Sequence, residues 1–337
     1  MSAANPERIA LPFPEDSVIF LPMIDEKSAA VKRIIDSIST VFVGKEAQIK
    51  TMIIGFLSGL HVLIEDVPGV GKTTLAKCLA SSVALDFGRI QFTPDLLPGD
   101  IVGMTTWNQE KREFIYKPGA IMHQFILADE INRASPRTQS SLLEAMEERA
   151  VTVDGVTYPL PEPFFVIATQ NPVHFVGAFP LPENQVDRFG ISFSMGYPTE
   201  ANEVEILTRF QTDNPLFELT PVCTPEQVLE IRREVRAVHV EEEIKQFIIR
   251  LSGETRRNSL IKLGLSPRAS QHLLLAAQTE AFMEERDFVI PEDVLAVSHA
   301  VLAHRLILSA EARMENKTPH EIIDGIRSRL PIPTGLK

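Results

Sequence analysis

Apolar positions along the chain change from a helical to a strand-like period before residue 65. From Val31 to Val41 the apolar residues recur at helical spacing, and a second helix is expected from about Glu46 to Ser58, ended by Gly59. The run His61–Glu65 is then continuously apolar and of strand length. The pattern therefore predicts two helices that lead into a buried strand.

Strand-like and helical segments alternate after this point. A helix is expected up to Glu148, because Ser135 and Pro136 supply a cap and a first-turn proline. This alternation predicts an α/β domain with a parallel sheet flanked by helices. Two hairpins interrupt it, one over 105–116 and one over 151–158, where Asp154-Gly155 suits a type I′ turn. The further strands are expected at 89–92, 125–128, 164–169 and 191–195.

Strand patterns stop after Pro198, and the last third of the chain is expected to be all helical. Thr224 begins a helix with a capping-box glutamine, Gln227, at its third position. The expected organisation is a proline-punctuated extension (1–28), the α/β domain (29–199), a linker (200–223) and a helical domain (224–337). Helical patterns cover 240–253, 267–285 and 291–309.

The segment Asp66–Thr73 lies between the predicted strand and a helix and nearly matches the phosphate-binding pattern G-x-x-x-x-G-K-[ST]. Gly69 and Gly71 would let the backbone approach a phosphate, while Lys72 and Thr73 supply a positive charge and a hydroxyl for Mg²⁺. Asp66 stands where the first glycine is usual. Because Asp tolerates turn conformations better than most residues, a nucleotide site is still predicted.

Polar side chains follow two further strands. Asp129 and Glu130 end an apolar strand, and Asn171 follows the next one. The carboxyl ends of parallel strands meet at one edge of the sheet, so Asp129 would hold Mg²⁺ and Glu130 would orient the attacking water. The alternatives are a solvated acidic loop and a turn-forming asparagine before a proline.

Charge and composition limit the function classes. The net charge of −12 and the pI near 5.2 argue against a protein that mainly coats nucleic acid or an anionic membrane. Cys78 and Cys223 form no disulfide framework. The N-terminal residues lack a secretory pattern, and the apolar stretch 52–64 is too short and too broken to span a bilayer. A cytoplasmic location without membrane insertion is expected.

The motifs in their order resemble the MoxR family of AAA+ ATPases over roughly residues 30 to 310. In that family aspartate is common at the first-glycine position of the phosphate loop. The segments that carry the resemblance are Asp-Val-Pro-Gly-Val-Gly-Lys-Thr (66–73), Ala-Asp-Glu-Ile-Asn-Arg-Ala-Ser-Pro-Arg-Thr-Gln (128–139), Ala-Thr-Gln-Asn-Pro (168–172), Asp-Arg-Phe (187–189) and Leu-Ser-Pro-Arg-Ala-Ser (265–270).

The resemblance implies a role for each motif residue. Arg188 matches the arginine finger that a neighbouring subunit directs at the γ-phosphate, although a surface arginine paired with Asp187 is the alternative. Arg268 matches sensor 2, which could act on its own or on a neighbour's nucleotide. The implied catalytic residues are Lys72, Glu130, Asn171 and Arg188. The implied metal ligands are Thr73 and Asp129, and the implied nucleotide-binding residues are Val43, Gly44, Pro68, Gly69, Val70, Gly71, Lys72, Thr73, Thr74 and Arg268.

The resemblance also implies an assembly. The expected protein is a homo-oligomeric ring, most simply a hexamer, that uses ATP and Mg²⁺ to remodel a client protein. The sequence has no D-x-S-x-S motif, so a von Willebrand A domain would be a separate partner. The rival functions are a DNA-directed AAA+ motor, the ATPase subunit of a metal chelatase, and a module that binds ATP with little turnover.

Both hairpins match inserts of this ATPase group, and such inserts tend to face the ring pore or a partner. The first carries Trp107 among Lys111, Arg112 and Lys117, a set that could grip a polypeptide or a nucleic-acid backbone. The alternative is a hairpin that packs its aromatic residue against its own domain.

Overall fold

The computed structural model describes residues 21–171, 179–211 and 215–333. Most of the expected extension over 1–28 lies outside these ranges. The first helix, α1 (Leu21–Val41), begins before residue 29, and α7 (Glu200–Phe210) occupies much of the expected linker. The helix expected at Glu46–Ser58 is α2, with Gly59 in the left-handed conformation at its end.

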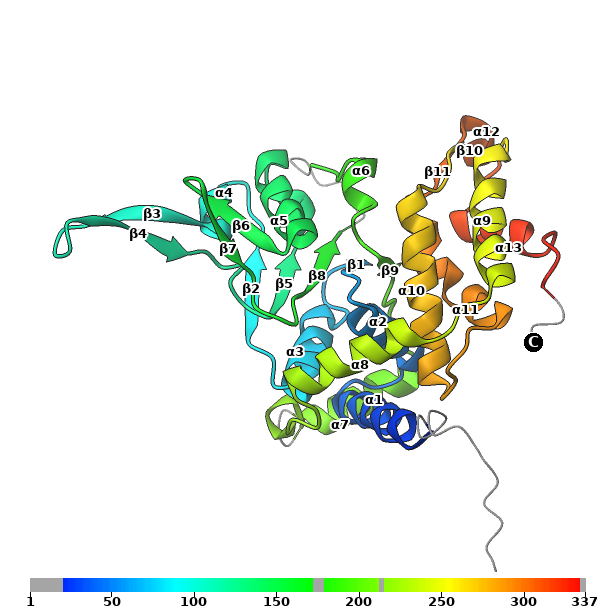
Figure 1. Cartoon of the computed structure of the whole chain (residues 1–337), viewed down its shortest axis with the longest axis horizontal. Coiled ribbons are helices and arrows are strands. Elements are labelled where there is room, and N and C mark those ends of the chain that lie inside the picture. The colour runs from blue at the N-terminus through cyan, green and yellow to red at the C-terminus, as the bar shows by residue number, and fades with distance from the viewer. Residues whose placement is uncertain (1–20, 172–178, 212–214, 334–337) are drawn as a thin grey trace, which may run out of the picture.

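A five-stranded parallel sheet forms the centre of the first domain (Figure 1). Its strand order is β2-β5-β8-β1-β9, so β8 lies between β5 and β1. The predicted parallel sheet between helices is confirmed. The strands are β1 (Val62–Glu65), β2 (Phe87–Gln91), β5 (Phe125–Asp129), β8 (Phe165–Gln170) and β9 (Ile191–Phe193).

Alternating side chains of the strands enter two hydrophobic clusters, one on each face of the sheet. Val62 and Ile64 of β1 point into the cluster that α1, α2 and α3 (Lys72–Ser82) complete. Leu63 points to the opposite face, which α4 (Pro98–Val102) and α5 (Pro136–Glu148) cover. The first cluster continues into the C-terminal domain, so that domain packs on one face of the sheet.

The C-terminal domain, which we call the lid, is built mainly from helices. Thr224 caps α8 (Pro225–Ala237) with the predicted capping box to Gln227. Beyond the sequence-based expectation, two short strands, β10 (Ile261–Leu263) and β11 (Ile307–Leu308), pair within the lid. The other helices of the lid are α9 (Glu242–Arg257), α10 (Pro267–Met283), α11 (Pro291–Leu302), α12 (Ala310–Met314) and α13 (Pro319–Arg327), with the 3-10 turn η3 (Ala303–Arg305) after α11.

Two antiparallel hairpins project from the sheet domain (Figure 1). Tyr116 of the β3–β4 hairpin stacks on Tyr158 of the β6–β7 hairpin, with ring centroids 3.9 Å apart. Farther along the first hairpin, Trp107 and Phe114 pack on each other. They are 53% and 70% exposed, so the tryptophan does not pack against the body of its domain. The strands are β3 (Gly103–Asn108), β4 (Glu113–Pro118), β6 (Ala150–Val153) and β7 (Val156–Pro159).

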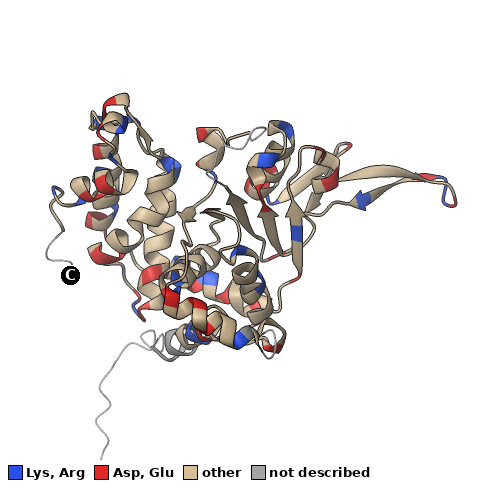
Figure 2. Ribbon diagram, turned by 180° about the vertical axis from the view of Figure 1, so that it is seen from behind, with Lys and Arg blue, Asp and Glu red and all other residues tan. Residues whose placement is uncertain are grey.

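Acidic and basic residues are intermixed over the helices on the face seen in Figure 2. No helix in the described part of the chain is long and apolar enough to cross a bilayer.

Candidate functional site

The phosphate loop connects β1 to α3 at the carboxyl edge of the sheet. Gly69 and Gly71 both have a φ of +86°, a backbone conformation that side chains other than glycine rarely adopt. A Cβ atom on Gly71 would lie 2.9 Å from the Phe42 ring, whereas one on Gly69 would meet no atom within 4 Å. The loop is therefore open at Gly69, and Pro68 beside it is exposed. This cradle fits a phosphate chain at the start of α3.

Lys72 begins α3 and points back across the loop. Its Nζ donates a hydrogen bond to the Asp66 carbonyl oxygen, 2.8 Å away. Burial lowers the pKa of Lys72, while the nearby carboxylates of Asp66, Asp129 and Glu130 raise it in part. Lys72 thus lies in the field of the two acidic residues that were predicted to share its site.

A pocket next to the loop has apolar walls suited to a nucleobase. Gly44 has a φ of +69°, which side chains other than glycine rarely adopt, and a Cβ atom there would lie 1.8 Å from Asn202 Nδ2. Gly44 itself is not among the pocket residues. The walls of the pocket come from the turn before α2, from the phosphate loop with the start of α3, and from the segment around α7. The lining residues are Val41, Phe42, Val43, Lys45, Gly69, Val70, Gly71, Thr74, Pro198 and Ile206.

Asp129 ends β5 and accepts two hydrogen bonds. Its Oδ1 accepts from Thr169 Oγ1 at 2.6 Å, and its Oδ2 forms an ion pair with Arg89 Nη2 at 2.6 Å. Each oxygen keeps a further lone pair. A carboxylate with a threonine hydroxyl, that of Thr73 in the first turn of α3, is the hard oxygen donor set that suits Mg²⁺. These residues fit the metal that the nucleotide would bring.

Glu130 follows in the left-handed conformation, with φ 56° and ψ 49°. Such backbone is costly for a residue other than glycine, and it clusters at functional sites. The Glu130 N–H donates to Thr169 Oγ1 at 2.9 Å, which holds this turn. Its carboxylate accepts from Gln91 Nε2 at 3.0 Å and from Arg133 at 2.9 Å. The carboxylate is thus held in a defined place beside Asp129.

Asn171 lies directly after β8, between the other two parts of the site. The Asp66 N–H donates to the carbonyl of Gln170 at 3.1 Å, so the end of β8 contacts the start of the loop. Asn171 is 9% exposed, and its carbonyl accepts from Asn132 Nδ2 at 3.1 Å. Loop, acidic pair and amide therefore share one edge of the sheet, as the strand pattern predicted.

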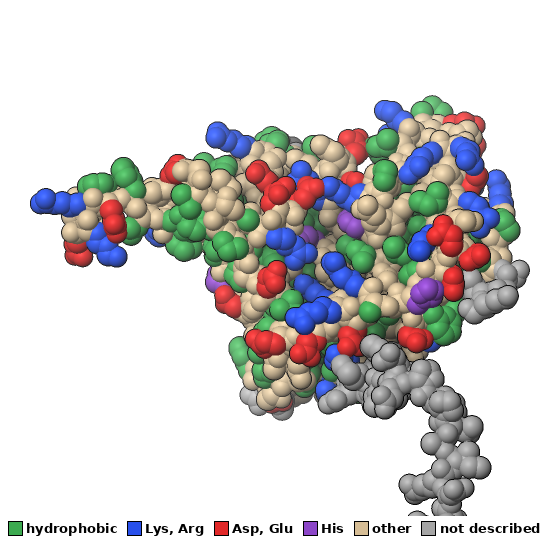
Figure 3. All heavy atoms as spheres, viewed as in Figure 1, with side chains coloured by type: hydrophobic (Ala, Val, Ile, Leu, Met, Phe, Trp, Pro, Cys, Tyr) green, Lys and Arg blue, Asp and Glu red, His purple; other side chains and the backbone are tan. Residues whose placement is uncertain are grey.

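The two predicted arginines lie together, but at the opposite edge of the sheet. Glu147 near the end of α5 pairs with Arg188 Nε at 3.3 Å and also with Arg268 of α10. They face a cleft that Arg149 and His272 also line, next to the residues just before β1. Figure 3 shows a hollow between the sheet domain and the lid with basic and histidine side chains at its walls.

The length of the sheet separates this cleft from the phosphate loop. Gly190, just before β9, donates its N–H to the carbonyl of His61, just before β1, so both mark the amino edge. β1 has four residues, and at about 3.3 Å per residue the two edges are about 13 Å apart. In one chain, Arg188 and Arg268 therefore lie at the edge of the sheet opposite to the loop that precedes α3.

The alternative of a surface pair between Arg188 and Asp187 is wrong. The Asp187 carboxylate bonds to Arg305 and Ser266, whereas Arg188 bonds to Glu147.

Sequence reasoning missed several residues of both edges. Arg89 and Gln91 were recognised only as part of a strand, although their alternation with buried Ile90 placed both on the polar side of β2. Glu147 is an ordinary exposed helix residue in the sequence. The walls contributed by Phe42, Pro198 and Ile206 come from segments far apart in the chain and carried no motif.

Comparison with known proteins adds to this geometry. The family model described as "ATPase family associated with various cellular activities (AAA)" matches residues 61–191, and a model of an AAA lid domain matches residues 253–326. The first covers the phosphate loop through the segment of Arg188, and the second covers Arg268 and Arg305.

Full-length relatives and a solved structure extend the match to nearly the whole chain. The chain is 46% identical to the protein YeaC of Bacillus subtilis, over 89% of this chain and 93% of YeaC. It is 38% identical to the chaperone MoxR1 of Mycobacterium tuberculosis, over 90% of this chain and 82% of MoxR1. A crystal structure of a candidate ATPase from Cytophaga hutchinsonii superposes with a TM-score of 0.86 at 40% identity, covering 93% of this chain and 99% of that one.

Proposed function

Because the chain belongs to the MoxR family of AAA+ ATPases, we propose that it hydrolyses Mg·ATP at sites formed between the subunits of a homo-oligomeric ring. The separation of the two clusters supports this most directly. The phosphate loop lies at one edge of the sheet, and Arg188 and Arg268 lie at the other. We call these the loop edge and the arginine edge of the sheet. A neighbouring subunit that places its arginine edge against the loop would complete the site.

In the proposed reaction each residue of the loop edge has one task. The glycine cradle and Lys72 hold the phosphates, and Glu130 orients the attacking water. Asn171 contacts the terminal phosphate or the water. Mg²⁺, held by Thr73 and Asp129, would neutralise charge on the phosphates. Glu130 would first exchange its bonds to Gln91 and Arg133 for one to the water.

We propose that Arg188 and Arg268 both act on the neighbour's nucleotide. Glu147 places one carboxylate between the two guanidinium groups, where a phosphate of the adjoining subunit would lie. Arginine binds carboxylate and phosphate oxygens with the same fork of donors. Three arginines and one glutamate line the cleft, so their net charge is positive and favours an anion.

The work of the ring is proposed to be the remodelling of a client protein. The chaperone name of the relative MoxR1 supports a protein client over DNA. From the family we further propose a hexamer and a separate partner with a von Willebrand A domain.

Turnover per subunit, measured over a wide range of protein concentration, tests the shared site. Wild-type turnover should rise with concentration, while Arg188→Ala should stay near zero throughout. Arg137→Ala is the matched control, because Arg137 is exposed on α5. If Arg188→Ala and wild type turn over equally at every concentration, the shared site is wrong.

A second measurement separates the DNA-directed alternative. Double-stranded and single-stranded DNA should leave turnover unchanged. Stimulation by DNA that falls steeply with salt would replace the protein client with a nucleic acid.

A further inference from the structure

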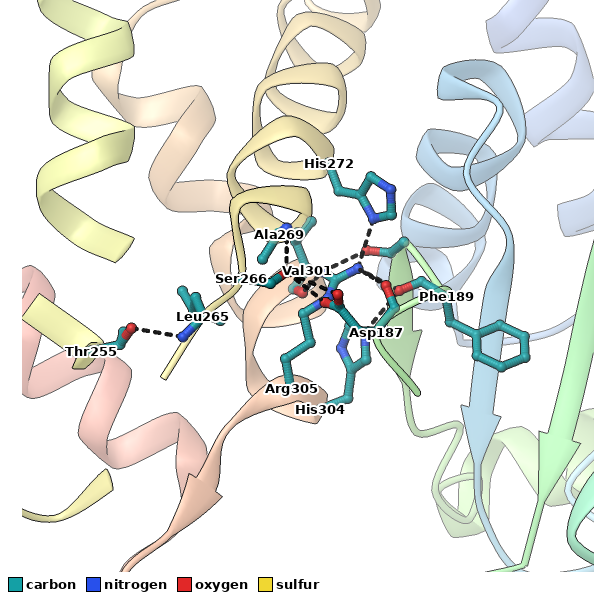
Figure 4. A network of polar contacts seen from close by, with 11 residues as sticks. Asp187, Phe189, Thr255, Leu265, Ser266, Ala269, His272, Val301, His304 and Arg305 are labelled. Carbon is teal, nitrogen blue, oxygen red and sulfur yellow. Dashed lines mark hydrogen bonds and ion pairs between the residues drawn. The ribbon is translucent and has the colours of Figure 1, made fainter. Parts of the chain in front are cut away.

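A buried arginine of the lid contacts the chain on both sides of Arg188 (Figure 4). Arg305 ends η3, and its side chain is 2% exposed. Its Nε bonds to Asp187 Oδ1 at 3.0 Å, and its Nη2 donates to the carbonyl of Phe189 at 2.6 Å. The guanidinium group therefore spans the residue that carries the proposed finger.

The same carboxylate also fixes the start of the helix that carries Arg268. Ser266 Oγ lies 3.0 and 2.9 Å from the two oxygens of Asp187. Ser266 is the N-cap of α10 and accepts the N–H of Ala269 at 3.2 Å. Arg268 lies in the first turn of that helix, so Asp187 joins both proposed trans-acting arginines to one buried network.

A histidine continues the network into the arginine cleft. Arg305 Nη2 lies 2.7 Å from His272 Nδ1, and His272 lines the cleft with Arg188 and Arg268. A guanidinium group only donates, so Nδ1 must accept and the proton of the neutral ring is on Nε2. Burial, together with Arg305 and Arg268, lowers the pKa of His272 to about 3, so the ring is neutral at neutral pH.

Such a network is a costly way to stabilise a lid. Burial lowers the pKa of Arg305 to about 10, which Asp187 opposes, and the group stays charged at neutral pH. A buried ion pair is often no more stabilising than well-packed apolar residues, although removal of one partner is harmful. The Nη1 group of Arg305 also has acceptors, the carbonyl oxygens of Gly190 and Val301. All three nitrogen atoms of the rigid guanidinium group are therefore held by acceptors, which fixes the orientation of the residues that supply them.

We propose that Arg305 is a positioning residue for the arginine finger. Its bonds to Asp187 and to the Phe189 carbonyl orient Arg188. Through Asp187 and Ser266 it also fixes the position of Arg268 relative to Arg188. This inference rests on the proposed role of Arg188 in the neighbour's site. Arg305 touches no nucleotide itself. Its loss should impair hydrolysis in the neighbouring subunit and spare nucleotide binding in its own.

The first test is a split between binding and turnover. Arg305→Lys keeps the charge but loses the fork, and Asp187→Asn keeps the shape but loses the charge. Each should lower ATP turnover of the assembled protein at least about tenfold, because a small misplacement of a catalytic group greatly lowers the rate. The Kd for ATP should change less than about twofold. If Arg305→Lys does not fold, Asp187→Asn decides the question.

A matched pair in the lid is the control. Arg286 bonds to Asp293 at 2.7 Å within the lid and is not among the residues that line the cleft. Arg286→Lys should lower the stability of the lid but leave turnover per assembled subunit unchanged. Wild-type turnover in Arg305→Lys and Asp187→Asn would overturn the proposal.

Mixed assemblies show where Arg305 acts. Glu130→Gln subunits have intact arginines but should not hydrolyse ATP, whereas Arg305→Lys subunits have an intact phosphate loop. Mixing the two should restore turnover above the sum of the separate proteins. Arg188→Ala mixed with Glu130→Gln should be rescued in the same way.

The two proposals fail separately in this experiment. If Arg188→Ala is not rescued, the finger does not act between subunits and the proposed function is wrong. If Arg188→Ala is rescued but Arg305→Lys and Asp187→Asn are not, only the positioning role of Arg305 is wrong.

Discussion

The carboxylate of Asp66 accepts a hydrogen bond from the backbone N–H of Gly196, with Asp66 Oδ2 and the nitrogen 2.7 Å apart. The same carboxylate accepts from Ser194 Oγ at 2.9 Å and from its neighbour Val67 at 2.7 Å. Although burial raises the pKa of Asp66, these hydrogen bonds outweigh it and leave the pKa below its usual value. The residue that departs from the common phosphate-loop pattern thus ties the loop to the segment after β9.

Restoring the common glycine at this position should therefore weaken the protein. Asp66→Gly would remove a buried carboxylate together with the hydrogen bonds that it accepts from Ser194 and Gly196. Because hydrogen bonds to charged groups contribute more than neutral ones, the expected loss is about 1.5–3 kcal/mol in the free energy of unfolding. Denaturant titration measures this loss, and Ser194→Ala, which removes one donor, should cost less. An Asp66→Gly protein as stable as wild type would show that the clamp contributes nothing.

Lys72→Ala should reduce ATP affinity while the fold persists. Hydrogen bonds to charged groups contribute about 1.5–3 kcal/mol, which corresponds to about a 10- to 150-fold rise in the Kd for ATP. Isothermal titration calorimetry measures the change. Lys77→Ala, on the exposed side of the same helix, is the control and should bind as wild type does. Unchanged affinity in Lys72→Ala would remove the phosphate loop from the site.

Glu130→Gln should bind ATP and fail to hydrolyse it. The amide has nearly the shape of the carboxylate but cannot accept the proton of water, and a general base typically contributes about 10²–10⁴ in rate. Single-turnover kinetics with labelled ATP separates binding from chemistry. Glu144→Gln, exposed on α5, should behave as wild type. Normal turnover in Glu130→Gln would assign the water-activating role to another residue.

Stability should fall as the pH drops below about 6.5, with His61 as one cause. His61 is 6% exposed, its Nδ1 accepts from the Val166 N–H at 3.0 Å, and its Nε2 donates to the Met146 carbonyl at 3.3 Å. Burial and the nearby Arg149 lower its pKa to about 3. Between pH 6.5 and 3 the unfolded chain binds a proton that the folded protein does not, which costs up to about 1.4 kcal/mol per pH unit.

The contribution of His61 is the difference between two proteins. Wild type should lose about 1 kcal/mol more stability between pH 7.5 and 5.5 than His61→Asn does. His239→Asn, at a side chain that is 64% exposed, serves as the comparison. Equal pH dependence in wild type and His61→Asn would show that another group dominates.

Local patterns were enough to predict the loop edge of the site. The apolar run before Asp66, and the polar residues after each buried strand, are written in consecutive residues, and the topology of a parallel sheet brings such ends together. The two hairpins were predicted for the same reason, since Asp154 and Gly155 do adopt the positive φ that the turn requires. The strands of the lid, with three and two residues, were too short to produce a readable period.

The arginine edge depends on contacts between distant segments, which no period reveals. Arg305 lies 118 residues from Asp187 in the chain, and Glu147 reaches Arg268 across 121. The family resemblance supplied Arg188 and Arg268 as residues, but not the carboxylate between them. Their shared place was visible only once the lid was packed against the sheet domain.

Trp107 is the single tryptophan of the chain, and it stands on the projecting hairpin. Its indole is half in water, so the intrinsic fluorescence of the protein comes from a solvated emitter remote from the core. Structural changes confined to the sheet core or the lid would leave that emission almost unchanged. A molecule that covers the hairpin tip would shift it to shorter wavelength and shield it from a soluble quencher. The protein thus carries its own optical probe for whatever touches this hairpin.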